Sequence, residues 1–125
     1  MKKILLATIS LLMMSCYEPP ERKCADFKTG KFRTEQTVNG KKTVMEFERN
    51  DSLETGILNG KQEIATIRWV NDCEYIMRKK DPKNYREAVA IGVKILTTSK
   101  NSYTFEYGEV GKSKKFTATA TKISD

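Results

Sequence analysis

After Cys24, apolar and polar residues alternate with a period of two, and turn-forming residues interrupt this alternation at short intervals. A period of two places successive side chains on opposite faces of a β-strand. Asn39-Gly40 and Asn59-Gly60 are the strongest turn signals, because both residue types tolerate a positive φ. No long segment after residue 16 has the spacing of an amphipathic helix. The pattern predicts eight strands, at residues 30–38, 41–49, 53–57, 61–70, 73–77, 88–98, 103–107 and 116–121.

Short strands joined in order by tight turns form an antiparallel meander. An open meander of this length leaves two unpaired edges, which promote aggregation, whereas closure removes them. We therefore expect an all-β fold, an eight-stranded antiparallel up-and-down barrel, with a flattened β-sandwich as the alternative. The chain of 125 residues has room for one such domain, which we assign to residues 24–125. Residues 79–87 break the alternation and form the longest loop, where Asp81-Pro82 is expected to start a short helical turn.

The first sixteen residues have the organisation of an export signal. Two lysines precede residues 4–14, an uncharged run of eleven residues that is too short for a spanning helix of about 20 residues. Ser15-Cys16 then resembles the lipobox of bacterial lipoproteins, in which the signal is cleaved before a Cys that carries a diacylglycerol and an N-acyl chain. The resemblance implies that residues 1–15 are removed and that lipid on Cys16 anchors the chain to a membrane. An ordinary signal peptide or a buried first helix is the alternative.

Residues 16–23 are then the lipidated N-terminus and a short spacer, since Pro19-Pro20 favours an extended backbone. In the lipoprotein sorting rule, an Asp directly after the lipidated Cys retains proteins at the inner membrane. Tyr17 occupies that position here. The resemblance therefore implies an exported outer-membrane lipoprotein, on the periplasmic face or at the cell surface.

Lipid on one of the three cysteines leaves Cys24 and Cys73 as a pair. In an oxidising compartment such a pair usually forms a disulfide, and closing a loop of about 50 residues contributes roughly 3–4 kcal/mol. Two free thiols or a metal site are the alternatives, although two distant cysteines without His make a poor metal site. In the predicted meander both cysteines lie at one end of the barrel, and the long loop lies at the other.

Gly30-Lys31-Phe32 resembles the Gly-x-Trp opening of lipocalin-type barrels, in which the aromatic residue closes one end of the barrel. The last predicted strand has no Arg to pack on that aromatic residue. Residues 24–32, 68–75 and 103–105 are similar to a family of small Bacteroidota lipoproteins that has no assigned activity. We expect Phe32 and Trp69 to be the aromatic residues of the barrel end.

The chain contains no His, which excludes Ser-His-Asp and Cys-His catalysis and the commonest set of zinc ligands. Glu46 and Glu48 share one face of a predicted strand, and we interpret them as surface residues. We therefore expect no enzyme activity, no catalytic residue, no metal and no cofactor other than the lipid on Cys16.

The net charge is +7, and removal of the two lysines of the signal lowers it to +5. Nucleic acid is not an expected partner of an exported protein, and anionic lipid or polysaccharide headgroups are the nearer counter-charges. Loops on rigid scaffolds often carry function. We therefore take the basic cluster of the long loop as the candidate site for a ligand or partner, with a solvated surface as the alternative. Its members are Lys79, Lys80, Lys83, Tyr85 and Arg86.

An eight-stranded barrel is wide enough to be filled by side chains or to hold one small ligand. The residues expected to face inward are large, so we expect them to fill most of the lumen. This favours a monomeric, lipid-anchored interaction module that binds a protein; the alternative is a lipocalin-like carrier of a small apolar or anionic ligand. A void on the order of several hundred Å³ at the long loop would favour the carrier. The expected inward residues are Phe32, Met45, Phe47, Leu53, Ile57, Ile67, Trp69, Tyr75, Met77, Ile91, Val93, Ile95, Tyr103, Phe105, Tyr107 and Phe116.

Overall fold

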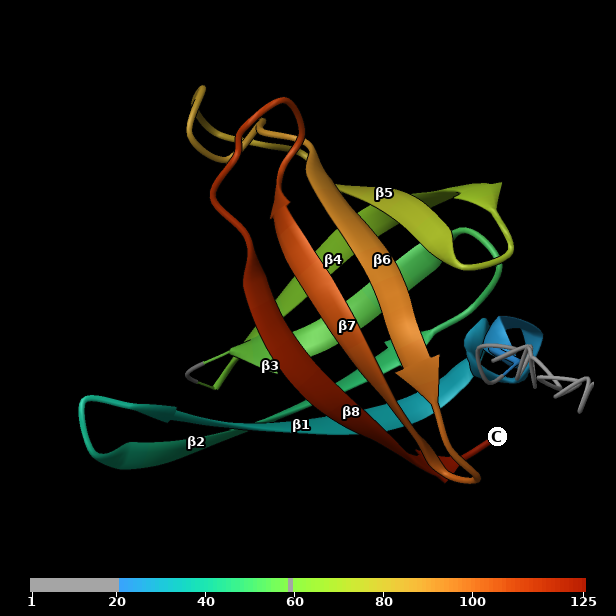
Figure 1. The fold of residues 1–125 in the computed structure, drawn as a ribbon. Helices are drawn as coiled ribbons and strands as arrows, with labels where there is room; N and C mark the ends of the chain where they lie inside the picture. The colour runs from blue at the N-terminus through green and yellow to red at the C-terminus, as the bar shows by residue number, and fades with distance from the viewer. Residues whose placement is uncertain (1–20, 59) are drawn as a thin grey trace, which may run out of the picture.

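The computed structural model describes residues 21–58 and 60–125, so the predicted signal, Cys16 and most of the predicted spacer lie outside the described residues. A short 3₁₀ helix, η1 (Cys24–Phe27), precedes eight strands (Figure 1). Each predicted strand is present. Within the described part of the chain, no helix has the length and apolar character needed to cross a membrane. The strands are β1 (Gly30–Val38), β2 (Lys41–Arg49), β3 (Leu53–Leu58), β4 (Lys61–Asn71), β5 (Glu74–Lys79), β6 (Ile91–Thr98), β7 (Ser102–Glu109) and β8 (Phe116–Ser124).

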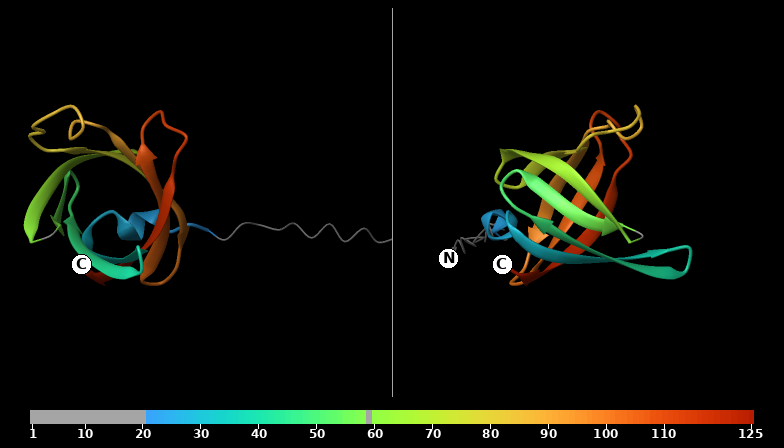
Figure 2. Two further views of the ribbon diagram at one scale, coloured as in Figure 1. Left: turned by 90° about the vertical axis from the view of Figure 1, so that its left-hand side faces the viewer. Right: turned by 180° about the vertical axis from the view of Figure 1, so that it is seen from behind.

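The strands form a closed antiparallel barrel in which each strand pairs with the next and β1 pairs with β8. The left view of Figure 2 shows them as a ring. The predicted all-β, up-and-down barrel is thus confirmed, and the alternative of a flattened sandwich is wrong. We call the end with the connections after β1, β3, β5 and β7 the mouth. The opposite end, with η1 and the turns after β2, β4 and β6, is the plugged end (Figure 1).

A disulfide between Cys24 and Cys73 joins η1 to the β4–β5 turn, with the two Cα atoms 5.2 Å apart. The predicted disulfide is therefore confirmed, and both cysteines lie at one end of the barrel as expected. Phe27 of η1 is buried, and its ring centroid lies 5.1 Å from that of Tyr103 on β7. The disulfide and this aromatic contact hold η1 across the plugged end.

The main hydrophobic core lies in the plugged half of the barrel. The ring of Phe32 stacks on that of Phe47 with their centroids 5.3 Å apart, and it meets the ring of Tyr103 edge-on at 5.7 Å. Offset and edge-on contacts of this kind are favourable beyond the area that they bury. The buried members of the core are Cys24, Phe27, Phe32, Phe47, Ile95, Tyr103 and Ala120, and a second cluster contains Ile67, Tyr75 and Val93.

The face predicted for the third strand is wrong, because Leu53 and Ile57 do not face the lumen. The register pairs Glu54 with Arg49, and paired residues share one face of a sheet. Arg49 is buried, so its charge requires a partner inside the barrel. Glu54 faces inward as that partner, and Ile57 is 59% exposed on the outer wall. Phe116 pairs with Tyr107 and stacks on its ring, so it is on the inner face as expected, although it lies at the mouth and is 47% exposed.

The helical turn expected at Asp81-Pro82 begins at Asn84 instead. Asp81 has a φ of 54°, which differs from the extended backbone of a helix N-cap. The carbonyl oxygen of Asn84 accepts a hydrogen bond from the backbone N–H of Ala88 at 3.1 Å. Its side-chain oxygen accepts one from the backbone N–H of Glu87 at 3.0 Å. This turn fixes the part of the long loop that reaches the mouth.

β1 and β2 extend beyond the ring as a two-stranded ribbon (Figure 1). The pairing of β1 with β8 covers residues 31–34, and that of β2 with β3 covers residues 47–49. In the outer part of the ribbon, β1 and β2 therefore pair with each other and not with the rest of the ring. The side-chain nitrogen of Gln36 donates to the hydroxyl of Tyr107 at 3.3 Å, which places the inner face of the ribbon beside the mouth.

Candidate functional site

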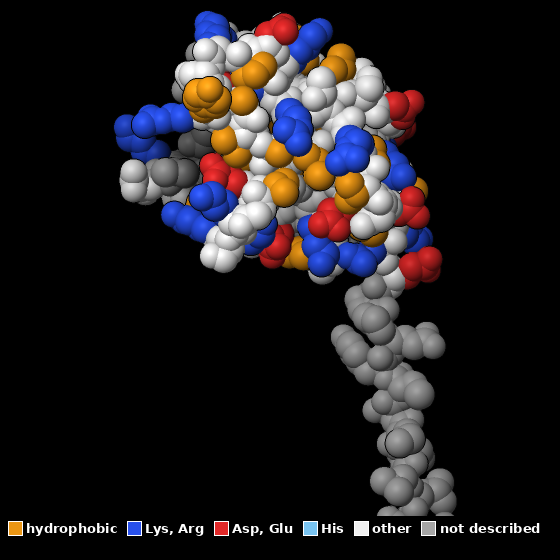
Figure 3. All heavy atoms as spheres, turned by 90° about the horizontal axis from the view of Figure 1, so that it is seen from above, with side chains coloured by type: hydrophobic (Ala, Val, Ile, Leu, Met, Phe, Trp, Pro, Cys, Tyr) orange, Lys and Arg blue, Asp and Glu red, His pale blue; other side chains and the backbone are white. Residues whose placement is uncertain are grey.

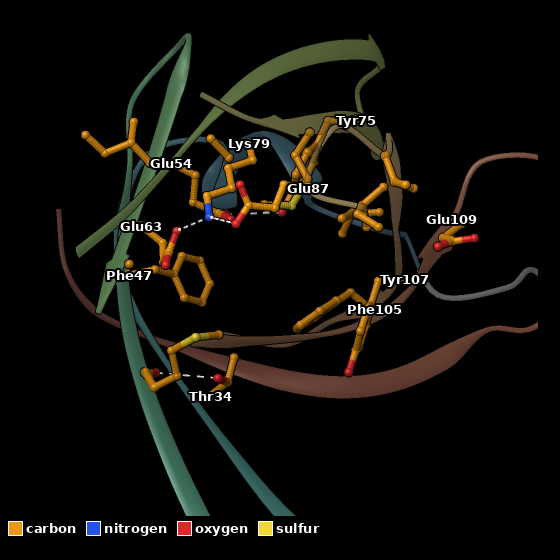
Figure 4. Close-up of a pocket in the computed structure, with 18 of the residues that line it drawn as sticks. Thr34, Phe47, Glu54, Glu63, Tyr75, Lys79, Glu87, Phe105, Tyr107 and Glu109 are labelled. Carbon is orange, nitrogen blue, oxygen red and sulfur yellow. Dashed lines mark hydrogen bonds and ion pairs between the residues drawn. The ribbon is translucent and has the colours of Figure 1, made fainter. Parts of the chain in front are cut away.

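The mouth half of the barrel contains a cavity of about 570 Å³, lined by side chains from β1 to β7 and from the β5–β6 loop (Figure 4). The expectation that side chains fill most of the lumen is therefore wrong. Two small residues on adjacent strands explain the space: Gly56 of β3 and Ala65 of β4 both line the cavity. The large side chains of the facing strands therefore have small side chains opposite them across the lumen.

Most of the cavity wall is apolar. Met45 and Phe47 come from β2, Met77 from β5, and Ile91 and Val93 from β6, and each faces the lumen in the alternation of its strand. Aromatic rings of β7 continue this surface toward the mouth. Their ring centroids lie 5.7 Å apart (Figure 4). A wall of this kind excludes water from an apolar ligand. The β7 rings are those of Phe105 and Tyr107.

An ionic group at the mouth connects two strands to the long loop. The ammonium nitrogen of Lys79 lies 3.2 Å from a carboxylate oxygen of Glu63 on β4 and 3.0 Å from one of Glu87 in the loop (Figure 4). The other oxygen of Glu87 accepts a hydrogen bond from the backbone N–H of Lys83 at 2.8 Å. This backbone bond and the one from Lys79 lower the pKa of Glu87, and the bonds to Glu87 and Glu63 raise the pKa of Lys79.

A buried guanidinium lies beneath the cavity. Arg49 donates to the carbonyl oxygen of Phe27 at 2.7 Å, to the hydroxyl of Tyr103 at 2.8 Å and to the carboxylate of Glu54 at 3.2 Å. Its guanidinium carbon lies 4.8 Å from the ring centroid of Tyr75. Burial raises the pKa of Tyr75 well above its usual value, and burial also raises the pKa of Tyr103. Both phenols therefore stay neutral and serve as hydrogen-bonding partners.

The five predicted loop residues do not form one cluster. The ammonium of Lys79 turns toward the carboxylates of the cavity wall, and Arg86 also lines the cavity. Lys80 and Lys83 are exposed, and Tyr85 is 96% exposed to solvent. The predicted site is thus divided between the lumen and the outer surface of the mouth.

The two predicted barrel-end aromatics lie in the plugged half. Phe32 is fully buried, and the guanidinium carbon of Arg49 lies 4.9 Å from its ring centroid. Trp69 is half-buried, with its ring centroid 4.7 Å from that of Tyr75. The ammonium of Lys28 lies 5.2 Å above the indole. The arginine that packs on Phe32 thus comes from β2, whereas the lipocalin resemblance implies one in the last strand.

The buried ion pair of Arg49 and Glu54 was not predicted from the sequence. The signal was present, because residues 45, 47 and 49 share one face of the predicted second strand. A cation at the third of these positions lies on the face that carries Met45 and Phe47. An acidic residue on the inner face of the next strand would then have been the expected partner.

Among the described residues, no group of three or more His, Cys, Asp or Glu side chains is arranged to hold a metal ion. Comparisons of the chain with protein-family models, with curated proteins and with solved structures found no match.

Proposed function

We propose that this protein is a non-enzymatic carrier of a small, mainly apolar molecule that occupies the lumen of the barrel. The observation that carries the proposal is the cavity of about 570 Å³ at the mouth. Ligand pockets commonly measure about 300–1,000 Å³ and have apolar walls with a few polar groups. The packed interaction module favoured from the sequence is the weaker candidate, because it requires a filled lumen.

The charges in the cavity favour an apolar ligand over an anionic one. The carboxylate of Glu54 is paired with Arg49, and those of Glu63 and Glu87 share Lys79. These carboxylates leave no surplus of positive charge on their side of the lumen. An anionic group placed among them would meet repulsion, whereas an alkyl or aromatic group gains from contact with the apolar wall.

The lipid anchor on Cys16 and the outer-membrane location belong to the same proposal. The first described residues are held at the plugged end: Arg22 donates to the carbonyl oxygen of Ile95 at 3.0 Å, and the backbone N–H of Lys23 donates to the Thr98 hydroxyl at 2.8 Å. A tether that starts there leaves the mouth free. Metabolic labelling with a fatty acid tests the anchor, because a Cys16→Ala variant should lose the label that the wild-type chain carries.

A filling substitution tests the carrier function. Ala65→Phe places a ring in the cavity, whereas Thr66→Phe adds the same ring to the exposed face of the same strand. The neutral apolar dye N-phenylnaphthylamine should fluoresce with the wild-type protein and with Thr66→Phe, and its affinity should fall at least tenfold (about 1.4 kcal/mol) in Ala65→Phe. Circular dichroism must show that both variants keep the barrel. Equal dye binding by the two folded variants would refute the use of the lumen.

A further inference from the structure

The mouth of the barrel is strongly basic. Its connecting segments, counted together with the strand residues next to them, are residues 39–42, 60–62, 80–90 and 109–115, and they contain nine basic and three acidic residues, a net charge of +6. All nine basic side chains are exposed. The acidic residues are Asp81, Glu87 and Glu109, and the basic residues are Lys41, Lys42, Lys61, Lys80, Lys83, Arg86, Lys112, Lys114 and Lys115.

The plugged end has no such excess. Its segments contain six basic and seven acidic residues, a net charge of −1. The barrel therefore has one charged end, although the alternation of the strands gives no reason for the two ends to differ. The net charge therefore favours an anionic partner at the mouth over one at the plugged end. The plugged-end segments are residues 21–30, 49–54, 70–74, 99–102 and 122–125.

Large apolar side chains are exposed among these charges. Tyr85 is 96% exposed in the β5–β6 loop, Val110 is 53% exposed in the β7–β8 loop, and Phe116 is 47% exposed where β8 begins. The two loops are joined, because the backbone N–H of Val110 donates to the carbonyl oxygen of Ala90 at 3.0 Å. Figure 3 shows Lys and Arg side chains interspersed with hydrophobic ones on the side of the molecule seen from above.

We propose that the mouth docks on a lipid bilayer with anionic headgroups, and that the apolar ligand is exchanged there. Basic residues attract such a surface, and exposed aromatic and aliphatic side chains enter its interface. The ammonium of Lys114 lies 5.3 Å from the ring centroid of Phe116, so charge and apolar surface meet at one point of the mouth. The exchange of ligand rests on the proposed carrier function, whereas the docking itself stands on charge and exposure alone.

A bilayer fits these observations better than nucleic acid or an acidic protein. A bilayer supplies both an anionic layer and an apolar layer beneath it, which matches lysines interspersed with exposed apolar side chains. It is also a source of molecules that suit the apolar cavity behind the mouth. The proposed anchor leaves from the plugged end, so the anchor and the mouth would contact different membrane surfaces.

Vesicle flotation of residues 21–125, which form the whole barrel, its core and its disulfide, tests the proposal. Vesicles of phosphatidylcholine alone are compared with vesicles that also contain phosphatidylglycerol. The mouth variant combines Lys80→Glu, Lys83→Glu and Lys114→Glu. The control variant combines Arg68→Glu, Lys94→Glu and Lys100→Glu, three exposed basic residues outside the mouth, so both variants have the same net charge. Dye binding is measured on every protein.

The wild-type protein and the control variant should float with the anionic vesicles and not with the neutral ones. The partition of the mouth variant should fall at least about tenfold, since each basic residue near an anionic surface contributes measurably. Tyr85→Ser alone should also weaken flotation. Equal losses in the two charge variants, no flotation of the wild-type protein, or displacement from the vesicles by duplex DNA would each overturn the proposal. Dye binding reports on the cavity separately, so failure of the carrier function is distinguishable from failure of docking.

Discussion

Arg49 joins three elements of the plugged half of the barrel. Its side chain is fully buried, and its three hydrogen-bond acceptors belong to η1, β3 and β7. It also lies within 4.9 Å of the Phe32 ring centroid. Removal of one partner of such a buried ion pair is strongly destabilising, because it leaves the other charge desolvated and unpaired.

Arg49→Met should therefore destabilise the protein by about 3–5 kcal/mol. The midpoint of urea denaturation, followed by circular dichroism, measures this change. Arg33→Met is the matched control, since Arg33 forms an exposed ion pair with Glu46, and its midpoint should stay close to that of the wild-type protein. Glu54→Gln added to Arg49→Met should recover part of the loss. Similar midpoints for the two single variants would contradict the role given to the buried charge.

For single residues, the sequence predicted the disulfide but not the buried ion pair. The disulfide followed from the count of three cysteines and the predicted export signal. The inward position of Glu54 did not follow, because hydrophobicity alone placed Leu53 and Ile57 inside. Strand periodicity gives two faces, and only the buried partner across the strand pair decides which of them is inner.

The strands and the long loop differ in how well the sequence predicts them. Strand alternation repeats over many residues and turn residues delimit it, so all eight strands could be located. The conformation of residues 80–90 depends on single contacts, such as that of Asn84 with Ala88. No periodic pattern encodes such contacts. The cavity could not be predicted either, because it results from small residues on β3 and β4 that face large ones across the barrel.

Glu87→Gln should loosen the long loop. The carboxylate of Glu87 holds Lys79 and the backbone N–H of Lys83, and the substitution removes its charge. Amide hydrogen exchange of residues 84–88 at neutral pH should become faster. Asp81→Asn, in the same loop, changes the charge equally and should leave the exchange rates unaltered. The same rates in Glu87→Gln and in the wild-type protein would show that the ionic group does not order the loop.

The same contact makes the loop sensitive to acid. The pKa of Glu87 is lowered in the folded protein, so the stabilisation is present above the ordinary carboxyl pKa of 4.5 and is lost as the pH falls through the lowered value. Loss of loop order in the wild-type protein should therefore occur only at a pH below that ordinary value.

The whole molecule combines a closed sheet with a covalent plug. The sheet closes through β1 and β8, and the disulfide joins residues separated by 49 positions in the sequence. Closure and the position of the disulfide could both be predicted, because alternating turns fix which end of a meander each residue occupies. The division of charge between the two ends follows from the same alternation of turns, whereas the exposure of the side chains at the mouth required the structure.

Replacement of both Cys24 and Cys73 by Ser should lower the free energy of unfolding by about 4 kcal/mol, as expected from the chain entropy released by a loop of this length. The strands pair without the disulfide, so the far-ultraviolet circular dichroism of the folded state should persist. Chemical denaturation with and without reductant measures the effect. An unchanged midpoint would show that η1 holds its place through packing alone.

The plug closes one end of the lumen, so the lumen opens at the mouth. The side chains of Phe27, Phe32 and Tyr103 block the plugged end. The proposed ligand would therefore enter and leave through the mouth. An elongated ligand that enters end-first would keep its trailing end toward the mouth, and that end would leave first. Orientation of the cargo would thus be decided at loading and preserved at delivery.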